Sequence, residues 1–208
     1  MKTMHVKITF IDSVLGTASG NPEVHSDYIA SKAPDAKSME EEVAAIGADG
    51  VEQKQMTVFP RDQDGNPIFW NYQIKGFFKS ACSALSKIKG TKSSGLKAYK
   101  KQIDLRIFVF PDAKDRSSRD ILIHTNKPVG VLQRPLRAST AQGERVALAS
   151  SEMIEAGAWC EFDIVMLNDE DEALVREWLD YGSLNGLGCW RNASHGAFIW
   201  EESKKAAA

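Results

Sequence analysis

Long hydrophobic runs are missing from this sequence, and their absence argues against a protein with membrane-spanning helices. No stretch of the 208 residues approaches the roughly 18 uninterrupted apolar residues of a membrane-spanning helix. The first twelve residues, MKTMHVKITFID, alternate polar with apolar positions, unlike the apolar core of a secretion signal. We therefore expect a soluble, cytoplasmic protein that makes no contact with a membrane.

Cysteine and histidine are scarce, which argues against a metal or cofactor protein. The three cysteines, Cys82, Cys160 and Cys189, are far apart and odd in number. This excludes a disulfide framework and a C-x-x-C metal site, so we interpret them as small interior residues. The four histidines share no metal-ligand spacing with a cysteine or an acid. A phosphate-binding Walker loop and a dinucleotide fingerprint are also missing, so we expect no cofactor.

Net positive charge is lacking too, although the charges are unevenly distributed. The formal net charge is -2 at pH 7, unlike that of a protein whose whole surface coats nucleic acid. Residues 74–103, however, contain eight lysines and no acid. We interpret this run as a local polyanion-binding surface, with a solvated helix face followed by a flexible loop as the alternative. The lysines that we select for binding are Lys75, Lys79, Lys92, Lys97, Lys100 and Lys101.

The apolar pattern predicts both strands and helices. Apolar and polar residues alternate in three segments, and two shorter apolar runs complete the set of strands. One helix is predicted from apolar residues at helical spacing, ending at Gly90, and another from an acidic first turn, ending at Gly182. The predicted strands cover residues 5–11, 103–109, 121–124, 160–166 and 197–201, and the predicted helices cover residues 74–88 and 169–181.

Reduced to its skeleton, this order is strand, helix, strand, strand, helix, strand. It predicts an α+β fold of the ferredoxin-like (RRM-like) kind, an antiparallel sheet with two helices on one face and the other face free. A free sheet face is a usual surface for single-stranded RNA. We expect one domain over residues 1–208, with long insertions at about 16–56, including a short acidic helix near 38–46, and at about 111–145. Residues 203–208 should be a disordered tail.

Three segments of the sequence are informative when they are considered together. They are RDQDGNPIFWNYQIKG (61–76), EMIEAGAWCEFDI (152–164) and LNGLGCWRNASHGAF (184–198). Taken together, they resemble the entry into the first helix, a later strand and the glycine-rich loop of the RAMP superfamily, the RNA-binding proteins of CRISPR effector complexes. The sequence WNYQ at 70–73 departs from the Pro-Gly-Ser-Ser that is usual there. The likeness is to the backbone subunits that line up along CRISPR RNA, rather than to the processing nucleases.

The resemblance implies a function and a set of partners. Backbone subunits bind single-stranded guide RNA, associate head to tail and contact other effector subunits. Some of them cleave target RNA with a loop aspartate. Here Asn21 lies in the corresponding region, which argues against cleavage.

The glycine-rich segment also has a direct physical interpretation. Gly186, Gly188 and Gly196 would let the backbone approach a phosphate closely and present its N–H groups, while Arg191 and His195 add donors. We therefore select these five residues for RNA binding. The alternative is a helix C-cap and turn before an edge strand.

A second basic set lies in the insertion at 111–145. Arg134 and Arg137 stand close to Arg145 in sequence, among hydroxyl residues, and guanidinium groups suit phosphates. We select Arg134 and Arg137 for RNA binding, with a structural crossover carrying surface arginines as the alternative. Among the tryptophans, Trp70 and Trp190 are predicted to be exposed enough to stack on bases.

Three functions remain open from the sequence. The first is a guide-RNA-binding backbone subunit of a CRISPR-like ribonucleoprotein. The second is a phage-encoded anti-CRISPR protein, a mimic of that subunit that binds and blocks an effector complex. The third is a metal-independent endoribonuclease that uses His195 as general acid or base, although no partner base is evident in the sequence.

Overall fold

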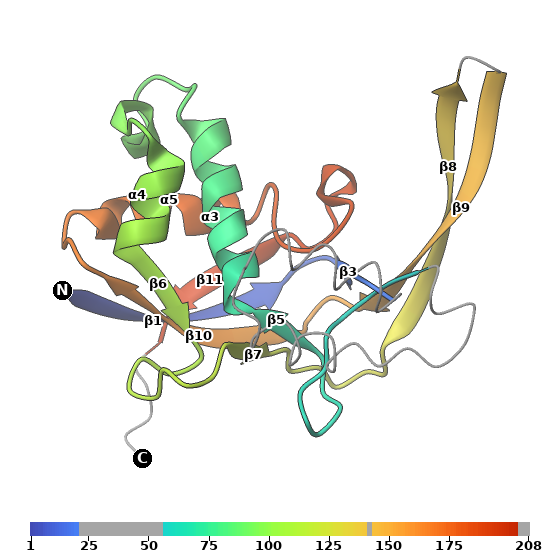
Figure 1. The fold of residues 1–208 in the computed structure, drawn as a ribbon, viewed down its shortest axis with the longest axis horizontal. Coiled ribbons are helices and arrows are strands. Elements are labelled where there is room, and N and C mark those ends of the chain that lie inside the picture. Colours follow the sequence, from blue (N-terminus) through green and yellow to red (C-terminus); the bar gives the residue numbers. More distant parts are fainter. Residues whose placement is uncertain (21–55, 141–142, 204–208) are drawn as a thin grey trace.

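The computed structural model describes residues 1–20, 56–140 and 143–203. Asn21, the helix expected near 38–46 and most of the expected tail lie outside these residues. The described chain is α+β, as expected, with three α-helices and several antiparallel strand pairs (Figure 1). No helix in the described ranges is long and apolar enough to cross a membrane.

The main sheet has four strands in the order β11-β1-β10-β6, and every neighbouring pair is antiparallel. The strand predicted at 5–11 is part of β1, and the strand predicted at 160–166 lies within β10. The last predicted strand corresponds to β11. The bounds are β1 (Lys2–Phe10), β6 (Ile107–Phe110), β10 (Trp159–Met166) and β11 (Phe198–Glu202).

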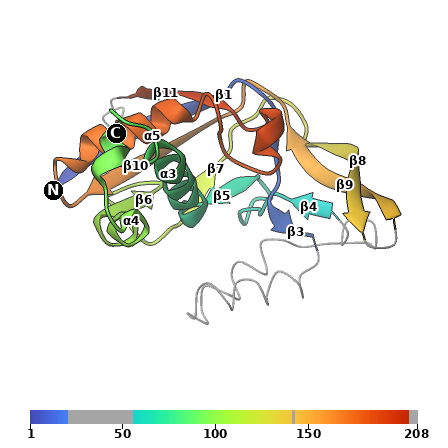
Figure 2. The same ribbon diagram turned by 90° about the horizontal axis from the view of Figure 1, so that it is seen from above.

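Three helices lie together on one side of β1 and β10, in both views (Figures 1 and 2). They are α3 (Asn71–Leu85), α4 (Tyr99–Arg106) and α5 (Asp171–Tyr181). At the start of α3, the side chain of Gln73 accepts the backbone N–H of Trp70 at 2.8 Å, which satisfies one of the unpaired donors of the first turn. Two of the three helices, α3 and α5, match the predicted pair.

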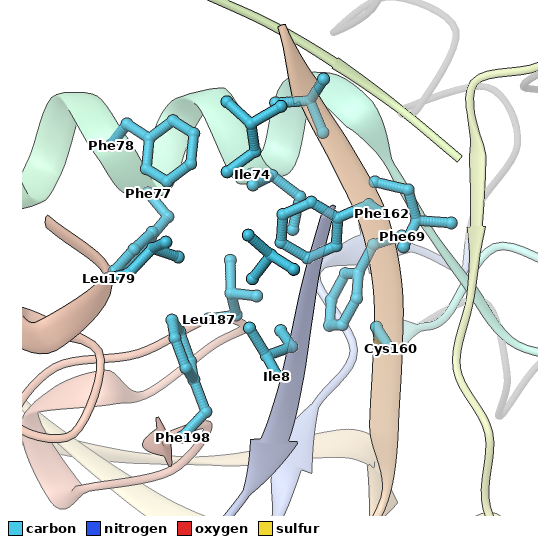
Figure 3. Close-up of a cluster of buried hydrophobic side chains, with 14 of the residues drawn as sticks. Ile8, Phe69, Ile74, Phe77, Phe78, Cys160, Phe162, Leu179, Leu187 and Phe198 are labelled. Atoms are coloured by element: carbon cyan, nitrogen blue, oxygen red, sulfur yellow. The ribbon is translucent and has the colours of Figure 1, made fainter. Parts of the chain in front are cut away.

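The core lies between this helical layer and the sheet. Alternate residues of β1 are buried against the helices, as the period of a strand requires. Figure 3 shows Phe77 and Phe78 of α3 and Leu179 of α5 in the same cluster as Ile8 and Phe162 of the sheet. Each such buried side chain contributes about 1.5–3 kcal/mol to folding. Sheet and helices are therefore one packed unit.

A second sheet carries a long hairpin that projects from the body of the protein (Figure 1). The hairpin strands pair from Gly130 with Met153 out to Thr140 with Gly143. The insertion expected at 111–145 thus contains β7 and all of β8. The bounds are β2 (Val14–Leu15), β3 (Ala18–Ser19), β4 (Met56–Val58), β8 (Gly130–Thr140) and β9 (Gly143–Ile154), and a separate pair joins β5 (Ile68–Trp70) to β7 (Asp120–Leu122).

The strand predicted at 103–109 is wrong in its first half. Residues up to Arg106 belong to α4, and β6 begins at Ile107. Alternation would place Ile103 and Leu105 on one face, yet Ile103 is 1% exposed and Leu105 is 59% exposed. Tyr99, four positions earlier in the same helix, packs against the same core cluster as Ile103, which is the spacing of a helix.

The tryptophans and cysteines follow the sequence interpretation in part. Trp70 was expected to be exposed but is only 3% exposed, because it lies in β5 and packs with a small second core cluster. Trp190 is 42% exposed, as expected. Cys82 and Cys160 are buried, and burial raises the pKa of both thiols, which confirms their interpretation as interior residues.

Candidate nucleic-acid interface

The glycine-rich loop, residues 184–197, is folded tightly after α5. Four of its residues have positive φ, and two of these, Trp190 at 54° and Ser194 at 68°, are not glycine. The backbone N–H of Leu187 is donated to the carbonyl of Gly196 at 3.0 Å, which closes the loop on itself. Cys189 donates its N–H to the carbonyl of Leu15 at 3.2 Å, which joins the loop to β2. The loop is therefore a fixed element.

Its glycines are required by close backbone contacts within the chain. A Cβ atom on Gly186 would lie 1.7 Å from the carbonyl oxygen of Gly196, and a Cβ atom on Gly196 would lie 1.6 Å from the carbonyl oxygen of Leu187. The N–H of Gly196 is donated to the carbonyl of Ser13 at 2.7 Å, so it is already used inside the protein. The expected contact of these glycines with a phosphate stays a prediction.

A basic and aromatic cluster forms where this loop meets the base of the hairpin. We call it the arginine–tryptophan cluster, and it consists of Arg134 from β8 with Trp190, Arg191 and His195 from the loop. The guanidinium carbon of Arg134 lies 4.5 Å from the centroid of the Trp190 ring. The His195 ring is stacked on the same indole, with centroids 5.1 Å apart. Residues that are distant in sequence are thus brought together.

Hydroxyl groups hold the two arginines of this cluster. Arg134 donates to the hydroxyl of Ser151 on β9, with Nη1 and Oγ 3.3 Å apart. Arg191 donates to the hydroxyl of Ser80 on α3, also at 3.3 Å. The loop, the hairpin and α3 therefore all contribute to one surface.

The charge of these two arginines is not neutralised by any described residue. Arg61, Arg106 and Arg176 each have a carboxylate partner, whereas no described carboxylate pairs with Arg134 or Arg191. The Nε of Arg134 is buried and has no hydrogen-bond partner in the same part of the chain.

The pKa of the Cys189 thiol is affected by both guanidinium groups. Burial raises the pKa of this thiol, while the charges of Arg134 and Arg191 oppose the increase. Both charges therefore lie near the same point. Two uncompensated guanidinium groups beside hydroxyls are suited to bind an anion such as phosphate.

His195 does not have the geometry of a base that activates a hydroxyl nucleophile. Its Nδ1 lies 2.8 Å from the hydroxyl oxygen of Ser13 and 3.9 Å from the carboxylate of Asp12. A serine–histidine–aspartate triad needs the hydroxyl and the carboxylate on opposite ring nitrogens, whereas here both contact the same one. The contact instead anchors the loop to the turn after β1.

The selected lysines lie elsewhere. Lys79 forms an ion pair with Asp104 at 2.6 Å, and Lys75 has Asp104 at 3.8 Å. Burial, opposed by the charge of Asp104, lowers the pKa of Lys75. The other selected lysines are exposed around the short helix η2 (Lys92–Gly95) and α4, which Figures 1 and 2 show on the far side of α3 from the loop. We call these four the lysine surface: Lys92, Lys97, Lys100 and Lys101.

The loop that carries the lysine surface is not free. Glu177 of α5 accepts the backbone N–H groups of Lys92 and Ser93 and the hydroxyl of Ser93. The predicted flexible loop is therefore attached to the helical layer at η2.

Two further arginines lie farther along the hairpin than Arg134. Arg145 is paired in register with Ala138, but its side chain and that of Arg137 lie outside the described residues.

Metal ligands are not gathered anywhere in the described ranges, where no group of three or more His, Cys, Asp or Glu side chains converges.

Some residues of the surface were missed by the sequence analysis. The sequence could have pointed to Asp104, which directly follows the acid-free lysine run. No signal in the sequence indicates that Ser13, Ser80 or Ser151 would contact the cluster, because each comes from a different element.

Comparison with known proteins gives no family assignment. No sequence-family model matches the chain, and no curated protein matches it. Among solved structures, it is similar to a chain of the cryo-EM structure of the Type III-B Cmr-beta bound to cognate target RNA, with 12% identity and a TM-score of 0.46. It is also similar to a chain of a Type IV-B CRISPR complex, with 11% identity and a TM-score of 0.47.

The two neighbours differ in length. The match covers 98% of this chain but only 60% of the Cmr-beta chain, so this protein spans less than two thirds of that neighbour. It covers 100% of this chain and 92% of the Type IV-B chain. Both similarities are weak, and both are with chains of CRISPR complexes.

Proposed function

We propose that this protein is a backbone-type subunit of a CRISPR-like ribonucleoprotein that binds single-stranded guide RNA through its phosphates. The observation that carries the proposal is the charge of Arg134 and Arg191 at the junction of the glycine-rich loop and the hairpin, which no carboxylate of the described residues pairs with. Guanidinium forks bind phosphate oxygens in pairs, and backbone contacts dominate the affinity for nucleic acid. RNA would therefore run along this junction.

The order of the main sheet supports the fold that the proposal requires. Numbered among themselves along the chain, its strands lie in the order fourth, first, third, second, with all neighbours antiparallel. We propose that this unit is ferredoxin-like, with α3 and α5 as its two helices.

The sheet face opposite the helices is a poorer RNA surface than the sequence suggested. Its aromatic side chains already have partners: Lys7 lies over the Trp159 ring at 4.7 Å, and His124 stacks on the same indole with centroids 3.8 Å apart. Arg116 lies over Phe110 at 5.6 Å. Rings with such partners offer little free face to a base, so we place the RNA at the arginine–tryptophan cluster.

The projecting hairpin supports an assembly with a partner. A two-stranded hairpin alone in water is marginally stable, and the outer part of β8 and β9 pairs with no other described strand. Pro135 interrupts the donors of β8, which hinders another strand from extending the sheet there. We propose that the hairpin contacts the bound RNA or a neighbouring subunit, including a second copy in head-to-tail order.

The test is RNA binding at several salt concentrations, measured by fluorescence anisotropy. For single strands the logarithmic salt slope changes by about 0.7 per phosphate contact, so the double variant Arg134→Ala/Arg191→Ala should lower it by about 1.4. The matched control, Lys114→Ala/Arg116→Ala, removes the same charge from an exposed loop and should leave the slope unchanged.

Two further results bear on the proposal. If replacing Lys97, Lys100 and Lys101 by alanine weakened binding more than the arginine variant did, the RNA would lie on the lysine surface. Wild-type protein that binds no RNA at low salt would refute the proposal. Tight binding of that protein to a purified CRISPR effector subunit would then favour the anti-CRISPR alternative.

A further inference from the structure

Trp190 is an unusual residue at the centre of the arginine–tryptophan cluster. Its backbone is left-handed, with φ at 54°, a strained conformation for a bulky residue that persists only where the surroundings enforce it. Its side chain remains 42% exposed, so burial of the ring explains little of this arrangement. The contacts of the indole are the guanidinium of Arg134 and the imidazole of His195.

The guanidinium of Arg134 lies over this indole. Arg134 has no carboxylate partner among the described residues, and within them its side chain donates one hydrogen bond, the 3.3 Å contact with the hydroxyl of Ser151. A free arginine side chain loses rotamer entropy when it binds a ligand. A guanidinium already placed over an aromatic ring has lost part of that entropy, and the ring covers its face without using its in-plane N–H groups.

We infer that Trp190 is a positioning residue that orients the Arg134 guanidinium toward a phosphate, and that this site recognises the sugar–phosphate chain without stacking on a base. The inference rests on the proposed function. It replaces the role of base-stacking platform that exposure alone suggested for Trp190, because two side chains already lie against the indole.

The inference predicts a pattern across two RNA probes. One probe is an oligouridylate strand, and the other has the same length and charge but abasic sugars throughout its central half. Trp190→Leu should weaken binding of both probes about five-fold, the scale of one cation–π contact. Trp190→Phe keeps an aromatic face for Arg134 and should restore most of the affinity. In an Arg134→Ala background, Trp190→Leu should have no further effect.

The chain offers a matched control at a second arginine–tryptophan contact. Arg176 lies over the Trp200 ring at 5.5 Å, outside the cluster. Trp200→Leu removes the same kind of contact and should leave RNA affinity unchanged, which separates a local effect from a general loss of stability.

The experiment separates failure of the inference from failure of the proposed function. If Trp190→Leu weakens binding of oligouridylate but not of the abasic strand, Trp190 stacks on a base and the inference is overturned. If the effects of Trp190→Leu and Arg134→Ala are additive, the indole does not act through Arg134, and the inference is again overturned. If the wild-type protein binds neither probe, the proposed function itself has failed.

Discussion

Replacing Glu177 by alanine should lower the free energy of unfolding by about 2–6 kcal/mol, because its carboxylate holds η2 against α5. It accepts the N–H of Lys92 at 2.5 Å, the N–H of Ser93 at 3.0 Å and the hydroxyl of Ser93 at 2.6 Å. Ser93 is fully buried, so water cannot readily replace the carboxylate there. Each buried donor left without a partner costs about 1–3 kcal/mol, which for two donors gives the stated range.

The assay is urea denaturation followed by circular dichroism, combined with limited trypsin digestion. Glu177→Ala should also speed cleavage after Lys92 and Lys97, because η2 loses its attachment to α5. Glu177→Gln keeps an acceptor but loses the charge, so it should cost about half as much. Glu170→Ala, an exposed residue just before α5, is the control. Equal stability of the Glu177→Ala and Glu170→Ala variants would refute the reasoning.

Three other experiments test the glycine-rich loop, a buried carboxyl group and the nuclease alternative. Gly196→Ala should cost more than 2 kcal/mol in urea denaturation, because its Cβ would overlap the Leu187 carbonyl and its φ is +76°; an unchanged midpoint would contradict this. Burial, opposed by Arg106, raises the pKa of Asp171. Its carboxyl therefore takes up a proton sooner in the folded state, so wild type should gain stability relative to Asp171→Asn as pH falls from 7 to about 4; a relative loss would show that the Arg106 ion pair dominates. RNA incubated with wild type in chelator should stay intact, and cleavage abolished by His195→Ala would revive the nuclease alternative.

The best-predicted elements are those with one buried face. β1, β10 and α5 lie close to their predicted bounds, because each places a regular apolar pattern against the core. The pattern failed at Ile103 and Leu105, where two apolar residues at a spacing of two resemble a strand. The contact of Ile103 with the core decides for a helix, and a local pattern cannot anticipate that contact.

The long hairpin has no comparable signal in the sequence. Only its base reaches the main core, at Ile154, and its outer part pairs with no other described strand, so regular alternation is not required there. Pro135 lies in the middle of β8 and argues from sequence against a strand. It is tolerated because β8 is an edge strand, paired with β9 and with no other strand of the described ranges.

The same limit applies to the site, where sequence counts charges but only the fold shows which of them are neutralised. The lysine run seemed the strongest basic feature, yet Asp104 pairs with Lys79 and approaches Lys75. Arg134 and Arg191 are far apart along the chain, yet the fold places both beside Cys189 with no described carboxylate partner. Because a compensated cation attracts a phosphate far less than an uncompensated one, two arginines outweigh two paired lysines here. The variant Asp104→Asn removes the carboxylate that pairs with Lys79 and approaches Lys75, and so tests this argument directly. It should strengthen RNA binding only if the RNA passes over Lys75 and Lys79. RNA binding should be unchanged if the RNA follows the arginine–tryptophan cluster.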